Sequence, residues 1–146
     1  ERSEKSDQAF TSILEDIPAA LPALNRAQKI QKRAAHVGFD WPDVLGALDK
    51  VEEEIAELKA ELKSGQAHQN NKERIADELG DLYFALTNVS RHLGLNAEQV
   101  TRQANDKFSR RFKSVEVLAN QKEQSLKALS LEEMECLWHQ VKANEK

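Results

Sequence analysis

The sequence contains little cysteine, proline, glycine or aromatic residue. Among 146 residues there are one cysteine, three prolines and five glycines, and aromatic residues make up 5%. A single cysteine, Cys136, cannot form an internal disulfide, which fits a reducing compartment, and we expect a cytoplasmic location. No apolar run approaches the roughly 20 residues that span a bilayer, so no membrane association is expected. The scarcity of helix-breaking residues favours helices.

The charge balance argues against a protein that binds nucleic acid. The net charge is −4, whereas domains that bind nucleic acid by bulk electrostatics are usually basic, so no nucleic-acid partner is expected. The length suits one domain with a real core. We expect residues 1–17 to form a polar linker or N-terminal segment and residues 18–146 to form one helical domain. Because the chain opens on a linker-like stretch, ERSEKSDQ, we expect it to be one part of a longer protein.

Hydrophobic periodicity predicts four long helices and a short last one. The expected ranges are 21–37, 43–63, 72–92, about 97–121, and a short helix that opens on a capping box from Ser130 to Glu133. Gly38 should end the first helix, and Pro42 should lie in the first turn of the second, with Asp40 or a neighbour as its cap. Because the loops are short, the predicted fold class is all-α, an antiparallel helical bundle.

Two apolar stripes mark the faces on which the second and third helices are expected to pack. Their residues recur in steps of four and three, as on one side of a helix. The first stripe contains Val44, Leu48, Val51, Ile55, Leu58 and Leu62, and the second contains Ile75, Leu79, Leu82, Leu86, Val89 and Leu93.

Acidic residues occupy the same positions relative to the apolar residues in two segments, KVEEEIAEL (50–58) and RIADELGDL (74–82). On each helix two acids lie one turn apart on one flank of the stripe. These four carboxylates are Glu54, Glu57, Glu78 and Asp81. If the stripes pack antiparallel, the acids converge on one pocket and repel unless a cation neutralises them. Ligands that are all oxygen favour Mg²⁺, with Mn²⁺ as a substitute.

The alternative is a solvated acidic surface on a non-catalytic dimerisation or regulatory module. Like-charge pairs one turn apart cost only ~0.2–0.5 kcal/mol, so repulsion alone does not require a metal. The recurrence of the pattern on two successive helices favours the metal site. Gly80 supports it, because glycine weakens a helix by roughly 1 kcal/mol relative to alanine, and a small residue beside Asp81 lets a ligand or another helix approach.

Two acidic motifs also carry a family resemblance. EEIAE (53–57) and ELGD (78–81) resemble the EExxE…ExxD signature of MazG, a family of all-α nucleoside triphosphate pyrophosphohydrolases. Other stretches are similar to the C-terminal half of long MazG proteins, namely RAQKIQKRAAHVGFDW, NVSRHLG, QANDKFSRRF and LEEMECLWHQVK. The similarity runs from about Leu21 to the end and lacks the first MazG repeat. The chain is therefore expected to be the catalytic half or a fragment.

The resemblance implies an enzyme that converts a (deoxy)nucleoside triphosphate to the monophosphate and pyrophosphate with Mg²⁺ held by the four carboxylates. It also implies a homodimer, which the apolar residues outside the stripes support: Tyr83, Phe84 and Phe112. The implied nucleotide-contacting positions are Lys50 to Glu54, Arg74, Lys107 to Arg111, and Trp138. For Trp138, packing in a core is the alternative to stacking on a base. Glu53 is our candidate to orient or deprotonate the attacking water, and a solvated Glu53 is the alternative.

Overall fold

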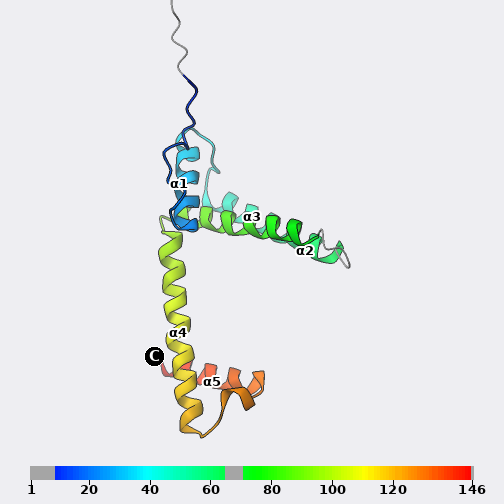
Figure 1. The fold of residues 1–146 in the computed structure, drawn as a ribbon, viewed down its shortest axis with the longest axis vertical. Helices are drawn as coiled ribbons and strands as arrows, with labels where there is room; N and C mark the ends of the chain where they lie inside the picture. The colour runs from blue at the N-terminus through cyan, green and yellow to red at the C-terminus, as the bar shows by residue number, and fades with distance from the viewer. Residues whose placement is uncertain (1–8, 65–70, 146) are drawn as a thin grey trace, which may run out of the picture. The chain divides into compact units, whose positions relative to one another are not determined.

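The computed structural model describes residues 9–64 and 71–145 (Figure 1). In these two ranges the chain is helical and contains no strand, which confirms the all-α class. The elements are α1 (Ala23–His36), α2 (Val44–Ser64), α3 (Asn71–His92), α4 (Ala97–Gln121), the 3-10 helix η1 (Leu126–Ala128) and α5 (Leu131–Asn144). The predicted helix ends agree with these bounds to within two residues. None of the described helices is both long and apolar enough to cross a membrane.

The chain divides into two compact units, Glu1–Glu98 and Gln99–Lys146. Helix α4 begins in the first unit and continues into the second. The predicted boundary of one helical domain at residue 18 stays a prediction.

In the first unit, α2 and α3 lie side by side as a helical hairpin, and α1 packs against α3 (Figure 1). The buried side chain of Gln31 on α1 donates from Nε2 to the carbonyl of Phe84 on α3 at 2.8 Å. Gln28 donates to the carbonyl of Leu95 and accepts from the amide of Ala97, both at 2.9 Å. Since the first amides of a helix lack internal partners, Gln28 satisfies one at the start of α4.

The turn between α1 and α2 confirms part of what was predicted about the residues that end one helix and start the next. Gly38 has φ +92°, a conformation that glycine adopts without steric cost, and it follows the end of α1. The neighbour that caps α2 is Asp43, whose Oδ1 accepts from the amide of Gly46 at 3.0 Å. Pro42 lies just ahead of this cap and not in the first turn, where the sequence analysis placed it, because α2 begins at Val44.

In the second unit, α4 and α5 share a small core of buried residues. Its members are Val115 and Ala119 on α4 and Leu137 and Val141 on α5, with Leu118, Leu126, Leu129 and Trp138 packed around them. Ser130 caps α5 by accepting from the amide of Glu133 at 3.1 Å, and its hydroxyl lies 3.2 Å from Oε1 of the same residue. The predicted cap is therefore confirmed.

Candidate metal centre

The most buried positions of α2 are not those of the predicted apolar stripe. Ala47, Val51 and Glu54 are buried, whereas Leu48 and Ile55 are 41% and 37% exposed. Positions 47, 51 and 54 are separated by four and three residues, so they share one side of the helix, rotated from the line through Leu48 and Ile55. The predicted packing face of α2 is thus partly wrong, because the apolar stripe combines residues of two adjacent faces. Glu54 was expected on the flank and lies instead on the buried face.

On helix α3 the buried side is likewise rotated from the predicted apolar stripe. Ala85 is buried and Ile75, Glu78 and Leu82 are partly buried, and all four fall at steps of three or four on one side of the helix. The stripe residues Leu79 and Leu86, in contrast, are 37% and 46% exposed. An acidic residue therefore lies on the more buried side of each helix in the hairpin.

Three of the four predicted ligands come together between these helices. One carboxylate oxygen each of Glu54, Glu78 and Asp81 lies within 4.8 Å of the others. The Glu54 side chain is only 5% exposed, Glu78 is partly buried, and Asp81 is exposed. Among the described residues, the Oε2 atoms of Glu54 and Glu78 are buried and have no hydrogen-bond partner. We name Glu54, Glu78 and Asp81 the acidic cluster.

The fourth predicted ligand, Glu57, lies beside the cluster. Burial, followed by a hydrogen bond with Glu57 and the charges of Glu57, Glu54 and Asp81, raises the pKa of Glu78 to about 7. Burial is also the main cause that raises the pKa of Asp81, to which the charges of Asp77 and Glu54 add. Burial and the neighbouring negative charges thus both disfavour the ionised forms of Glu78 and Asp81.

One cation does reach the cluster. Nζ of Lys50 lies 3.0 Å from Oε1 of Glu54 and 3.4 Å from Oε1 of Glu53. The hydrogen bond with Glu54 is the largest cause of a raised pKa of the Lys50 ammonium, and it outweighs the opposing effect of burial. Glu53, the candidate base, has a side chain that is 57% exposed, so solvent reaches it. Arg74, on α3, is exposed as well.

The other predicted substrate contacts belong to the second unit. Arg111 holds Glu145 through three hydrogen bonds of 2.9, 3.1 and 2.9 Å, and its guanidinium carbon lies 5.9 Å from the centre of the Trp138 ring. Trp138 also packs against Phe108, with ring centres 5.4 Å apart. The core role left open for Trp138 is therefore present, and its contact with a base stays a prediction. Lys107 is exposed on α4.

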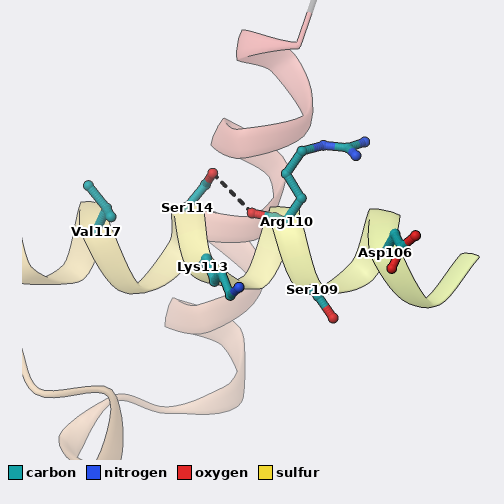
Figure 2. Close-up of a pocket in the computed structure, with 6 residues that line it drawn as sticks. All are labelled: Asp106, Ser109, Arg110, Lys113, Ser114 and Val117. Carbon is teal, nitrogen blue, oxygen red and sulfur yellow. Dashed lines mark hydrogen bonds between the residues drawn. The ribbon is translucent and has the colours of Figure 1, made fainter. Parts of the chain in front are cut away.

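A surface hollow of about 460 Å³ lies along α4 (Figure 2). Its lining residues are Asp106, Ser109, Arg110, Lys113, Ser114 and Val117. The hydroxyl of Ser114 donates to the carbonyl of Arg110 at 3.2 Å, a bond that is internal to the helix. All six lining residues belong to α4, so the hollow lies on the surface of one helix.

The chemistry of the acidic cluster suits a metal ion. Three carboxylates offer oxygen ligands only, and the unpaired Oε2 atoms of Glu54 and Glu78 are buried acceptors that a cation would satisfy. The group Glu54, Glu78 and Asp81 could therefore hold a metal ion. The structure defines an all-α domain with a carboxylate centre built on a helical hairpin.

Sequence comparison assigns this domain to a family. The model of the MazG nucleotide pyrophosphohydrolase domain matches residues 44–116, which contain α2, α3 and most of α4. The chain belongs to the MazG family, as the acidic motifs indicated.

Similar curated proteins extend the match over nearly the whole chain. The nucleoside triphosphate pyrophosphohydrolase of Escherichia coli is 46% identical over 97% of the chain. The nucleoside triphosphate pyrophosphohydrolase/pyrophosphatase MazG of Thermotoga maritima is 33% identical over 99%. The chain spans about half the length of these relatives, 53% of each. It also matches YabN of Bacillus subtilis, with 40% identity over 99% of the chain and 29% of that protein.

The sequence did not predict two sets of side-chain hydrogen bonds. Asp40, in the turn before α2, bonds with Arg91 and His92 at the end of α3, and Glu145 bonds with Arg111. These contacts join positions 51, 52 and 34 residues apart, and no local pattern indicates them. The Lys50–Glu54 pair was detectable, because oppositely charged residues four apart on a helix are neighbours.

Proposed function

We propose that the chain is a catalytic domain that hydrolyses (deoxy)nucleoside triphosphates to the monophosphate and pyrophosphate, with Mg²⁺ as its metal. The observation that carries the proposal is the environment of Glu54, whose side chain is 5% exposed and whose Oε2 is unpartnered beside two further carboxylates. A buried carboxylate is costly unless a proton or a cation compensates it. Family membership and the names of the Escherichia coli and Thermotoga maritima relatives support the reaction.

In this proposal the four carboxylates Glu54, Glu57, Glu78 and Asp81 hold the metal. Mg²⁺, or Mn²⁺ in its place, would supply a bound water of lowered pKa and positive charge beside the phosphates. Glu53 is assigned to orient or deprotonate the attacking water; its exposed carboxylate one turn before Glu57 supports this assignment.

The phosphate groups are assigned to basic side chains. Lys50 borders the cluster directly, and Arg74 and Lys107 are exposed cations. Arg111 already holds a carboxylate with Nε and Nη2, and the same planar fork fits two phosphate oxygens. Trp138, which lies under Arg111, is assigned to the nucleotide base or sugar.

We further propose a cytoplasmic homodimer. Several large apolar side chains of the hairpin are exposed in the single chain: Leu48, Leu62, Leu79, Tyr83, Phe84 and Leu86, at 37% to 58%. Exposed apolar side chains in this number favour an interface between proteins, and a second copy is the simplest partner that covers them.

The decisive test is pyrophosphate release from a triphosphate in the presence of Mg²⁺. Glu54→Gln and Asp81→Asn should each abolish turnover while circular dichroism shows that the fold is kept. Asp49→Asn is the matched control, since Asp49 is an exposed acid on the same helix outside the predicted nucleotide contacts, and it should retain turnover. A panel of the eight ordinary triphosphates with deaminated and oxidised ones would then define the base and sugar preference.

The competing function is a non-catalytic dimerisation or regulatory module. It predicts no turnover of any triphosphate and no change of melting temperature across a Mg²⁺ titration. The enzyme predicts the opposite, because a ligand bound only by the native state must raise its stability.

A further inference from the structure

Lys50 shares a carboxylate with the proposed metal. Its Nζ lies 3.0 Å from Oε1 of Glu54, and this oxygen belongs to the most buried member of the acidic cluster. Lys50 and Glu54 are four residues apart on α2, so their side chains lie over the same turn. Lys50 keeps a side chain that is 35% exposed, and its ammonium therefore has a path to solvent.

The pair compensates the cluster only in part. Within the described part of the chain, Lys50 is the cation whose ion pair reaches Glu54, Glu78 or Asp81. Oε1 of Glu54 has this partner, whereas Oε2 is buried and has none. One positive charge thus faces three carboxylates, and the second oxygen of the central carboxylate remains available to a further cation.

The ammonium and a divalent ion should oppose each other at this position. Mg²⁺ binds carboxylate oxygens at about 2.0–2.1 Å, so an ion held by Glu54 would share that carboxylate with the Lys50 ammonium, whose Nζ lies 3.0 Å from Oε1. Like charges that share one carboxylate repel strongly in a partly desolvated site, even though both are attracted to it. Occupancy by the metal should therefore weaken the Lys50–Glu54 pair.

We propose that Lys50 is the internal counterion of the metal-free acidic cluster and that divalent metal displaces its ammonium from Glu54. The proposal rests on the metal site of the proposed function. Lys50 stabilises the buried Glu54 carboxylate before metal binds, and afterwards the released ammonium is free for the phosphates of the substrate. Since coupling between two ligands of one site is reciprocal, Lys50 lowers metal affinity by the same factor by which metal weakens the pair.

The test compares metal binding by Lys50→Gln, Lys59→Gln and the unmodified chain without nucleotide. Lys59→Gln is the matched control, because it removes the same charge from an exposed position on the same helix. Each chain is stripped with EDTA and titrated with Mg²⁺ or Mn²⁺ alone by calorimetry. Loss of the competing charge should tighten binding roughly tenfold in Lys50→Gln. Its melting temperature in EDTA should fall below that of Lys59→Gln, and saturating Mg²⁺ should remove the difference.

A measurement on the unmodified chain covers the case in which Lys50→Gln does not fold. The side-chain ammonium resonance of Lys50, identified with Lys50→Arg, should shift on addition of Mg²⁺, while that of Lys59 stays in place. Equal metal affinities of Lys50→Gln and Lys59→Gln, or an unmoved Lys50 resonance at saturating Mg²⁺, would overturn the counterion role and leave the proposed function intact. Absence of metal binding by the unmodified chain would overturn both.

Discussion

Oδ1 of Asp40 lies 2.9 Å from Nε2 of His92, and this contact ties the turn before α2 to the last turn of α3. The same oxygen accepts from Nη2 of Arg91. The side chains of His92 and Arg91 are 10% and 16% exposed, so Asp40 is a partner for polar atoms that water reaches little. The turn is thereby fixed at the end of the hairpin that carries the acidic cluster.

Replacing Asp40 should destabilise the first unit. Asp40→Ala leaves two largely buried polar side chains without this partner, which costs about 1–3 kcal/mol in the free energy of unfolding. Asp49→Ala, at an exposed position of α2, is the control and should change little. Urea denaturation measures both values. Equal losses in the two variants would contradict the structural role of Asp40.

Acid should remove part of the stability that Asp40 provides. Burial raises the pKa of its carboxyl, but the hydrogen bonds from Arg91, His92 and the Trp41 amide together outweigh this effect and hold the pKa below its usual value. A depressed pKa in the folded state gives stability that is present above the unfolded value near 3.8 and is lost as the pH falls through the folded value. The difference in melting temperature between the unmodified chain and Asp40→Ala should therefore shrink below about pH 4.

The metal-free acidic cluster should give the opposite pH dependence. Since the pKa of Glu78 is raised from 4.5 to about 7, the folded chain binds a proton more tightly than the unfolded chain. The resulting stability is fully present below pH 4.5 and is lost as the pH rises through about 7. In EDTA the melting temperature should thus fall between pH 5 and pH 8. Glu78→Gln should flatten this fall, and a fall of the same size in Glu78→Gln would refute the assignment to Glu78.

Trp138 should contribute to both stability and turnover. Trp138→Ala removes a ring that packs on Phe108 and on the core of the second unit, and truncations of this kind cost about 3–5 kcal/mol at fully buried sites, so a smaller loss is expected at this partly buried one. Trp138→Phe keeps most of the packing. If the ring also contacts the nucleotide, Trp138→Phe should raise KM for the triphosphate at nearly unchanged melting temperature. An unaltered KM would leave Trp138 with a packing role only.

Self-association should depend on the exposed aromatic residues of α3. The proposed dimer has twice the chain mass of 16.5 kDa, which light scattering after gel filtration measures directly. Phe84→Asp places a charge on the apolar hairpin surface and should shift the chain to monomer. Leu131→Asp is the control, because Leu131 is 70% exposed at the start of α5. A monomeric unmodified chain, or a dimer that tolerates Phe84→Asp, would rule out this interface.

Local rules made the helices predictable from the sequence. The scarcity of glycine and proline and the four-three apolar rhythm predicted the helices themselves, although not their buried sides. The end of α1 at Gly38 and the cap of α5 at Ser130 also depend on neighbouring residues alone, and both are present in the structure. The spacing of the acids on α2 and α3 also depends only on helical geometry, so it placed Glu54, Glu78 and Asp81 in one cluster correctly.

The tertiary structure decided which side of each helix is buried. A helix can present several apolar lines, and only its packing partner selects one; the selected side of α2 contains Glu54 and leaves Leu48 and Ile55 exposed. Contacts between distant positions, such as Asp40 with His92 and Arg111 with Glu145, likewise exist only once the chain has folded. The sequence by itself determined where the helices begin and end and which acids could meet, since both follow from short-range geometry. Burial and the pKa of about 7 for Glu78 arise from packing and nearby charges, so only the folded hairpin established them.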